Sequence, residues 1–338
     1  MELLENLISA VGVSGSEESV RNIISEEMKP FVDKSYVDNL GNFIAQKKGT
    51  VPRVMLASHM DEVGLMIKNM DMNGRIYFST VGSIDSLALI AQKVVIKGDV
   101  ESVQGVITTK EMMQGDIINY LPKIADLMVD TGLTKKELDS KGVKVGSPIS
   151  FIKPLFYLGS KQIISGKALD DRVGCYILCE LAKRLKKNKN EIFYVFTVQE
   201  EVGLYGAKVS AYEVEPAYAI AVEVTETDEY APMATKQIGR GPVITVKDAE
   251  MLGSKCINNW LTDIAKKKRI PIQYSVSESG TTDALAISLS KGGIPSTVVS
   301  VAVRNIHTGV GVVNKKDIEN AIDLLEGLLI NPPLTCIV

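Results

Sequence analysis

Histidine is scarce in this chain of 338 residues, which contains only His59 and His307, so the setting of each can be judged individually. Basic residues are not in excess either, since 38 Lys and Arg stand against 41 Asp and Glu, for a formal net charge of -3. Such a balance offers no broad positive field to nucleic-acid phosphates or anionic lipids. We therefore expect no nucleic-acid partner and no binding to a membrane.

The chain also lacks long apolar runs and clustered cysteines. No run approaches the roughly 18 residues that a membrane-spanning helix needs, and the opening residues MELLENLI carry acidic rather than basic side chains, unlike a secretory signal. None of the four cysteines belongs to a CxxC pair. Cys175 and Cys179 lie in an apolar stretch and are expected to be small buried side chains rather than a metal or redox site. The resulting expectation is a reducing, cytoplasmic location.

What the chain does contain is typical of a folded protein of about two domains. Hydrophobic residues make up 45% and charged residues 23%, which excludes disorder. Strand-like and helix-like segments alternate after Gly166, and this pattern predicts a largely parallel sheet covered by helices on both faces. The expected strands are 192–198, 218–224 and 296–303, and the expected helices are 171–185, 254–267 and 316–329.

The N-terminal part is expected to join the same sheet. Residues 51–58 form a short apolar run typical of a buried strand, and this strand leads directly to His59. Ser14 and Glu17 have capping-box spacing, and they precede an amphipathic helix that extends to Met28.

Between residues 67 and 159 the pattern changes to short β-like runs broken by glycine, such as IYFSTVG and QGVITT. This pattern predicts a small β-rich barrel or sandwich inserted into the chain. The predicted fold class is α/β, with a mostly parallel central sheet flanked by helices and an inserted small β-rich barrel domain. Residues 1–66 and 160–338 would form the α/β domain, and residues 67–159 the insertion.

Polar side chains follow the ends of four predicted strands. They are His59 and Asp61 after residues 51–58, Glu200 and Glu201 after 192–198, Glu223 at the end of 218–224, and His307 after 296–303. Any one carboxylate at a strand end is usually a loop or cap residue. Because ligands of open α/β sheets bind outside the carboxyl ends of the strands, we expect all six side chains to meet in one crevice.

Asp170, in GKALDDRVG, is a seventh candidate at the predicted start of a helix, where amide groups and the helix dipole favour an anion. An N-cap role is the simpler alternative, but Asp171 is also acidic and capping readily explains only one of the two. Histidines and carboxylates without a thiolate suit zinc, cobalt or manganese. Two such ions would be balanced by three carboxylates and a hydroxide in a dinuclear hydrolytic centre.

Six ordered strings of the chain resemble the signature blocks of a known family. They are SHMDEVGLMI, GKALDDRVG, VQEEVGLYGA, AVEVTETD, SGTTDALAI and IHTGVGVVNKKD. The chain resembles the glutamyl aminopeptidase-like family of dinuclear metallo-aminopeptidases, which form tetrahedral particles and often carry the name endoglucanase or cellulase. The resemblance runs from the first helix to the last and implies a zinc-exopeptidase-like fold. It also implies a homo-oligomer whose dimers form through the β insertion and assemble into a dodecamer.

The resemblance implies a role for each of the polar residues at the strand ends. One of two divalent metal ions, zinc or cobalt, would be held by His59, Asp170 and Glu223, and the other by Asp170, Glu201 and His307. Glu200 would be the general base, and Asp61 would orient His59. Adjacent residues of extended chain point in opposite directions, which agrees with different roles for Glu200 and Glu201.

Two positions depart from the family pattern. Glu223 stands where the family usually has an aspartate ligand, and Gly311 stands where it commonly has a glutamate. Asp283, in GTTDA, lies in a loop that the family places near the active site. It is either a substrate-binding residue or the N-cap of a helix beginning near Ala284.

The function that these residues favour is a cytosolic, metal-dependent aminopeptidase that removes N-terminal residues from short peptides. Glu223 also keeps open a related metal-dependent carboxypeptidase or deacylase. An endoglucanase could use two of the carboxylates, but it would leave both histidines and Asp170 unexplained. An assembly protein that has lost catalysis is the fourth alternative.

Overall fold

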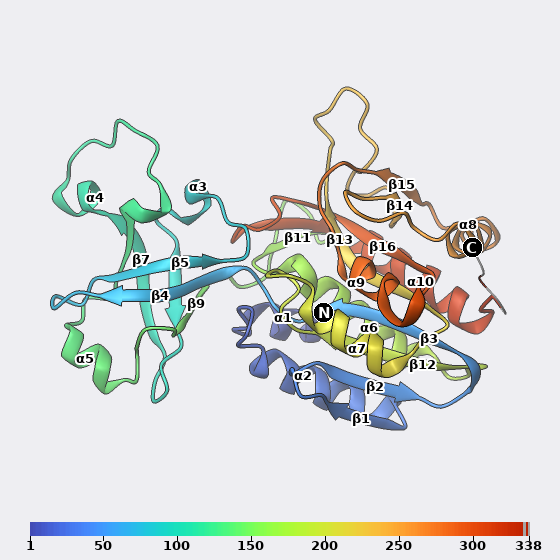
Figure 1. Cartoon of the computed structure of the whole chain (residues 1–338). Helices are drawn as coiled ribbons and strands as arrows, with labels where there is room; N and C mark the ends of the chain where they lie inside the picture. The colour runs from blue at the N-terminus through green and yellow to red at the C-terminus, as the bar shows by residue number, and fades with distance from the viewer. Residues whose placement is uncertain (334–335, 337–338) are drawn as a thin grey trace.

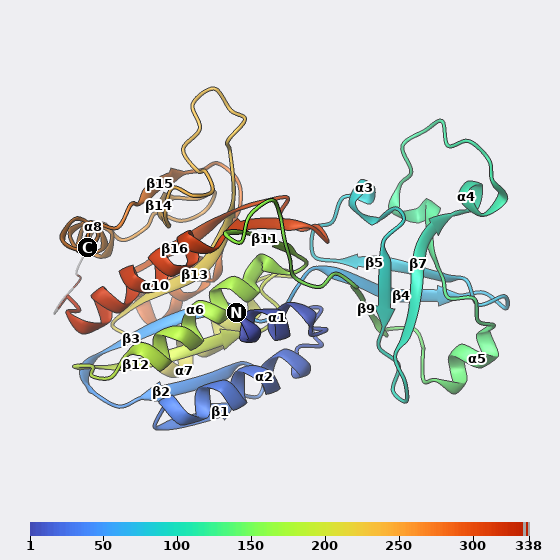
Figure 2. The same ribbon diagram turned by 180° about the vertical axis from the view of Figure 1, so that it is seen from behind.

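The computed structural model describes residues 1–333 and residue 336, and it has two parts (Figure 1). One part is an α/β body built on an 11-stranded sheet, and the other is a closed barrel that lies to one side of it (Figure 2). The predicted fold class, an α/β protein with an inserted β barrel, is therefore confirmed.

The sheet of the body has the strand order β1-β2-β12-β3-β13-β16-β17-β11-β10, with β14 and β15 continuing from β16. Its four central strands β12, β3, β13 and β16 are mutually parallel, whereas β1, β2, β17, β11 and β10 are joined by antiparallel pairing. The predicted parallel arrangement thus holds at the centre of the sheet. The strand bounds are β1 Lys34–Val37, β2 Phe43–Lys47, β3 Thr50–His59, β10 Phe156–Tyr157, β11 Ile163–Gly166, β12 Asn190–Thr197, β13 Tyr218–Glu226, β14 Val243–Lys247, β15 Gln273–Val276, β16 Ser296–Arg304 and β17 Gly311–Asn314.

Helices cover both faces of this sheet because apolar side chains alternate along its strands. In β3, Val54 and Leu56 pack toward α1, α2, α6, α8 and α10, while Met55 and Ala57 pack toward α7 and α9. None of the helices in the described part of the chain is long and apolar enough to cross a membrane. The helix bounds are α1 Glu2–Ser9, α2 Glu18–Met28, α6 Leu169–Arg184, α7 Tyr205–Val214, α8 Lys255–Lys268, α9 Asp283–Ser288 and α10 Lys315–Ile330, with short 3-10 turns at Lys29–Phe31 and Ser290–Gly292.

The capping box predicted from Ser14 and Glu17 is wrong. Helix α2 begins at Glu18 without a side-chain cap. Ser14 Oγ donates instead to Asp61 Oδ2 at 2.6 Å, and Glu17 Oε1 accepts from the amide of Gly15 at 2.6 Å. A buried carboxylate far along the chain therefore takes the hydroxyl that local spacing assigned to the helix.

The barrel closes in the order β4-β5-β8-β7-β6-β9 and has an apolar core of its own. Its strands begin at Gly64 and end at Phe151, and the glycine-broken runs of the sequence correspond to them. Division of the chain at residues 66/67 and 159/160 stays a prediction. The bounds are β4 Gly64–Met70, β5 Ile76–Val81, α3 Ser86–Leu89, β6 Lys93–Ile96, β7 Val103–Thr109, α4 Lys110–Gln114, a 3-10 turn Ile124–Asp126, β8 Leu127–Asp130, α5 Lys135–Ser140 and β9 Pro148–Phe151.

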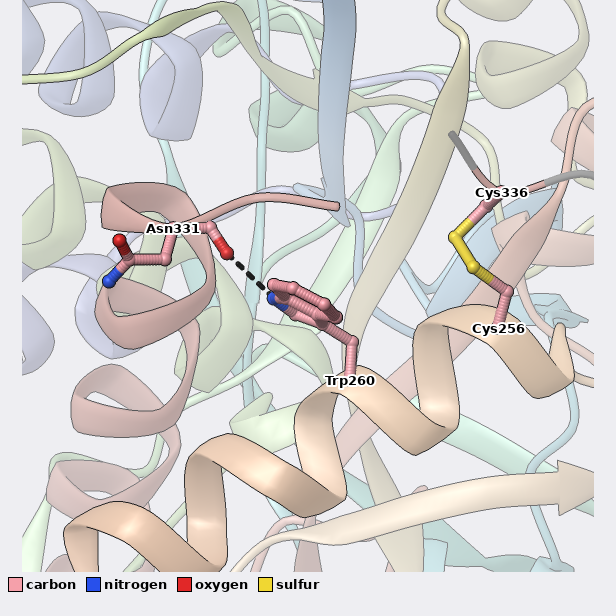
Figure 3. The surroundings of a disulfide bond; sticks show 4 residues. All are labelled: Cys256, Trp260, Asn331 and Cys336. Carbon is pink, nitrogen blue, oxygen red and sulfur yellow. Dashed lines mark hydrogen bonds between the residues drawn. A yellow bond between two sulfur atoms is a disulfide. The ribbon is translucent and has the colours of Figure 1, made fainter. Parts of the chain in front are cut away.

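A disulfide joins Cys256 at the start of α8 to Cys336, 80 residues further along the chain (Figure 3). One turn along α8, Trp260 Nε1 donates to the carbonyl oxygen of Asn331 at 2.6 Å, so this helix contacts both Asn331 and Cys336. Cys175 and Cys179 are buried thiols, as expected. Disulfides are rare in the reducing compartment that the sequence led us to expect.

We expect Cys256→Ser to lower the free energy of unfolding by about 2–4 kcal/mol, because the disulfide closes a long loop and so restricts the unfolded chain. The check is thermal unfolding with and without dithiothreitol, which should lower the melting temperature of the wild type but not of Cys256→Ser. A wild type that unfolds at the same temperature in both buffers would show that the disulfide does not stabilise the fold.

Candidate active site

The central strands bring the polar side chains at their ends together. His59, the last residue of β3, lies beside Thr197, the last residue of β12, in the parallel register of the two strands. Glu200 and Glu201 follow β12, and His307 follows β16. On β13, Glu223 pairs with Ser300 of β16. Since β12, β3, β13 and β16 are neighbours in this order, the crevice expected at the carboxyl ends of four strands is present.

Two groups of three side chains in this crevice are close enough to share a metal ion. His59, Asp170 and Glu223 each offer a ligand atom within 4.8 Å of the other two, and so do Asp170, Glu201 and His307. These are the two ligand sets that the family resemblance implied, with Asp170 common to both.

Asp170 spans the two groups with its two carboxylate oxygens. Oδ1 lies 3.0 Å from His59 Nε2, and Oδ2 lies 3.2 Å from His307 Nε2. Glu223 Oε2 lies 3.5 Å from His59 Nε2, and Glu201 Oε1 lies 3.4 Å from His307 Nε2. A single carboxylate is therefore placed to bridge two ions.

The neighbouring acid, Asp171, has the structural role. Its Oδ1 accepts from the amide of Gly174 at 2.9 Å, and its Oδ2 accepts from Ser58 Oγ at 2.6 Å. The peptide bond between Asp170 and Asp171 is cis, and the first turn of α6 is not helical at these two residues. Asp171 therefore caps the regular part of the helix, and the carboxylate of Asp170 faces the site.

Asp61 holds His59 from behind. His59 Nδ1 lies 3.1 Å from the carbonyl oxygen of Asp61 and 3.5 Å from its Oδ1. Because a carbonyl oxygen can only accept, Nδ1 carries a proton, and Nε2 is the nitrogen that faces Asp170 and Glu223. This is the orientation that a metal-binding histidine with an outer carboxylate partner adopts.

Asp61 also fixes the segment that carries the two glutamates. Its Oδ1 accepts from the amide of Glu200 at 3.0 Å, and its Oδ2 accepts from the amide of Glu201 at 3.2 Å. One buried carboxylate therefore sets the backbone of both residues as well as the ring of His59.

Two residues that the sequence did not assign to the site hold the preceding part of this segment. Asn42 Oδ1 accepts from the amide of Val198 at 3.0 Å, and Glu17 Oε1 accepts from the amide of Gln199 at 3.2 Å. Asn42 and Glu17 are both buried. Four successive amides, from 198 to 201, are thus held by side chains from three distant parts of the chain, and no local signal in the sequence marks Asn42 or Glu17.

The glutamates of the site are crowded with other acids. Burial, together with the charges of Asp283 and Glu201, raises the pKa of Glu200 well above its ordinary value. Burial and the charge of Asp171 do the same to the pKa of Glu223. The pKa of Glu201 rises to about 7 through burial and the charge of Asp170. A cation at this position would relieve all three effects.

The two histidines respond to the same excess of negative charge. Burial lowers the pKa of His59, but the carboxylates of Glu223 and Asp170 outweigh it, and the pKa lies well above its ordinary value. Burial also lowers the pKa of His307, but the hydrogen bond to Asp170 outweighs this effect and the pKa rises to about 8. Burial raises the pKa of Asp170, but hydrogen bonds from the two histidines outweigh this effect, so the pKa is lowered.

Unpaired oxygens show that the residues fit metal ions. Glu201 Oε1 and Glu223 Oε1 are buried and have no hydrogen-bond partner among the described residues. Buried carboxylate oxygens without a partner are costly, and each of these two belongs to one of the two groups. Histidine nitrogen and carboxylate oxygen are the donors that zinc and cobalt accept in hydrolytic sites.

Asp283 lies behind the site rather than in it. It is fully buried as the first residue of α9, where its Oδ2 accepts from Thr197 Oγ1. The N-cap is Thr282, whose hydroxyl accepts from the amide of Ala284 at 3.3 Å. Burial raises the pKa of Asp283 to about 6. The suggested cap role is therefore wrong by one residue, and a substrate-binding role stays a prediction.

The two groups open onto one cleft of about 1680 Å³, part of it exposed to solvent. Glu200 lines this cleft together with His59, Asp170, Glu201, Glu223 and His307. The cleft is large enough for the end of a peptide, and a carboxylate with a raised pKa lies beside the two candidate metal positions.

Known proteins are similar to this chain in sequence and in fold. The family model described as M42 glutamyl aminopeptidase matches residues 41–324. A lysyl aminopeptidase from Pyrococcus furiosus is 32% identical over 97% of this chain and 96% of its own. A solved TET aminopeptidase from Thaumarchaeota archaeon SCGC AB-539-E09 is 34% identical, covers 99% of this chain and 96% of its own, and has a TM-score of 0.94.

A second solved structure is that of the TET1 peptidase of Pyrococcus horikoshii, which can assemble into a tetrahedron or a large octahedral shell. It is 31% identical, covers 98% of this chain and 99% of its own, and has a TM-score of 0.88. The family model extends over well more than half of the sequence. As the resemblance predicted, this chain belongs to the M42 glutamyl aminopeptidase family and is a metal-dependent aminopeptidase.

Proposed function

We propose that the two groups that share Asp170 hold one divalent metal ion each, zinc or cobalt, and that the enzyme removes N-terminal residues from short peptides. The observation that supports this proposal most strongly is the shared carboxylate, with one oxygen toward each histidine. One histidine and one terminal glutamate per ion complete the two sets.

Glu200 is the general base of the proposed reaction. When bound, the two ions would lower the pKa of a water molecule and polarise the peptide carbonyl. Glu200 takes the proton of the attacking water and passes it to the leaving amine. Its carboxylate lines the cleft beside both sets of ligands, and Asp61 fixes its backbone.

The alternatives differ in which residues they use. An endoglucanase needs two carboxylates, and this chemistry leaves the two histidines and the shared Asp170 without a function. A carboxypeptidase or deacylase would use the same ligand sets, with Glu223 as the longer terminal carboxylate. An assembly protein without catalysis would have no use for a carboxylate held beside the two sets, as Glu200 is.

Metal removal and reconstitution test the proposed function. Protein freed of metal by a chelator should not cleave aminoacyl-p-nitroanilides, and addition of zinc, cobalt or manganese should restore cleavage. The matched substrates are one peptide with a free N-terminus and the same peptide acetylated at that end. Cleavage of the acetylated peptide from its C-terminus would favour a carboxypeptidase, and glucan hydrolysis that resists the chelator would favour an endoglucanase.

We also propose that the chain forms a homo-oligomer, built from dimers that associate through the barrel. We further propose that the chain acts in the cytoplasm. The barrel supports the first proposal because the segment from α4 to the following turn exposes apolar side chains. They are Met112, Met113, Ile117 and Leu121. Contiguous exposed apolar side chains are typical of protein interfaces.

A further inference from the structure

The cleft extends from the candidate metal positions to a wall formed by β14, β15 and the segment before α9. Most side chains that this wall contributes to the cleft carry a hydroxyl. The hydroxyl-bearing residues are Thr245, Ser275, Ser277, Ser279, Thr281 and Thr282. Hydroxyl-bearing side chains offer little apolar surface to a large apolar side chain, whereas they can exchange hydrogen bonds with a polar one, so the wall is suited to a polar side chain.

Asp248 contributes a carboxylate to this wall. The residue is only 7% exposed. Its Oδ1 accepts from the amides of Glu250 at 2.9 Å and Met251 at 2.7 Å. Its Oδ2 is buried and has no hydrogen-bond partner among the described residues, although the residue lines the cleft. The turn accounts for the position of Oδ1, but no contact among the described residues accounts for the burial of Oδ2.

The neighbouring charged residues do not supply a hydrogen bond to the carboxylate of Asp248. Lys247 Nζ donates to the carbonyl oxygens of Asp248 and Ser277, at 2.9 and 3.1 Å, rather than to the carboxylate. The carboxylate of Asp228 is occupied by Thr235 and by the amide of Lys236.

The balance of charge on this part of the cleft is negative. Glu226, Asp228 and Asp248 line it with a single cationic side chain among the described residues, that of Lys236. An acidic excess in a partly enclosed cleft attracts a cation and repels an anion.

We propose that Asp248 is a specificity residue, whose Oδ2 receives the ammonium or guanidinium group of an N-terminal lysine or arginine. This inference rests on the proposed aminopeptidase function. A cationic side chain would supply the missing hydrogen bond of a buried carboxylate, and charge-assisted bonds of this kind are among the strongest in proteins. An N-terminal glutamate would instead face three carboxylates.

The variant that tests this inference is Asp248→Asn, because an asparagine keeps the Oδ1 acceptor of the turn and removes the charge. With metal-loaded enzyme, kcat/KM for lysyl-p-nitroanilide should fall by about 10- to 100-fold, while kcat/KM for leucyl-p-nitroanilide stays within about threefold of wild type. The matched control is Asp263→Asn, which removes an exposed aspartate from α8 and should leave the ratio of the two unchanged.

A purely structural role for Asp248 predicts a different result, namely an equal loss on both substrates, and that result would overturn the proposal. So would a wild type that prefers glutamyl-p-nitroanilide to the lysyl substrate. Binding of L-lysinamide and L-leucinamide, measured by calorimetry, separates this inference from the proposed function because it needs no turnover. If no substrate is cleaved, the proposed function fails, whereas weaker binding of L-lysinamide alone to Asp248→Asn would still support the specificity role.

Discussion

Replacement of Glu200 by glutamine is expected to lower kcat by about 10²- to 10⁴-fold, which is the usual contribution of general acid–base catalysis. Glutamine has the same shape but cannot accept the proton of the attacking water. Glu200 belongs to neither of the two groups that could hold metal, so the metal content of Glu200→Gln should equal that of the wild type.

The assays for this variant are steady-state kinetics on an aminoacyl-p-nitroanilide and elemental analysis of the same sample. Glu101→Gln is a suitable control, because Glu101 is an exposed residue of the barrel, and it should retain wild-type kcat. A Glu200→Gln enzyme with normal kcat would remove Glu200 from the mechanism. Loss of metal from this variant would instead make Glu200 a ligand.

Replacement of Asp170 by asparagine is expected to weaken both metal positions together. The charge of Asp170 is shared between the two groups, and an amide is a much poorer ligand than a carboxylate. The affinity for each ion should fall by more than the roughly 10- to 100-fold that follows loss of an outer partner, and activity should fall with it.

Titration of metal-free protein with zinc, followed by calorimetry, measures this effect. His59→Ala and His307→Ala are the informative comparisons, since each should weaken one position and spare the other. Asp263→Asn should bind as the wild type does. If Asp170→Asn lost only one ion, the bridging role would be refuted.

Much of this site could be predicted because sheet topology brings distant residues together. His59, Glu201, Glu223 and His307 each follow or close an apolar run, and the carboxyl ends of neighbouring parallel strands meet at one edge of a sheet. The structure makes β12, β3, β13 and β16 neighbours. Prediction of the individual strands was therefore sufficient to group the polar side chains at their ends, some of which are more than 200 residues apart.

The residues that support the site could not be predicted in the same way. Glu17 holds the amide of Gln199, 182 residues away, and Asn42 holds that of Val198, 156 residues away. Both bonds depend on how α2 and the turn before β2 pack against the loop after β12, which periodicity does not report. For the same reason, the local spacing of Ser14 and Glu17 indicated a helix cap where the hydroxyl of Ser14 instead binds Asp61.

The departures at Glu223 and Gly311 become clearer in the fold. Glu223 reaches His59 Nε2 at 3.5 Å despite its extra methylene, so the longer carboxylate still faces the site. A Cβ at Gly311 would lie 3.1 Å from Leu169 Cδ1, which is closer than most such contacts. A larger residue at this position would require the side chain of Leu169 to shift by a few tenths of an ångström.

The central claim is that each chain holds two metal ions between His59 and His307, bridged by Asp170. Its most direct test is the number of zinc or cobalt ions bound per chain in the reconstituted wild-type enzyme, counted by native mass spectrometry together with elemental analysis. We predict two ions per chain, and one ion in His59→Ala and in His307→Ala. A fully active wild type that binds a single ion would contradict the dinuclear centre.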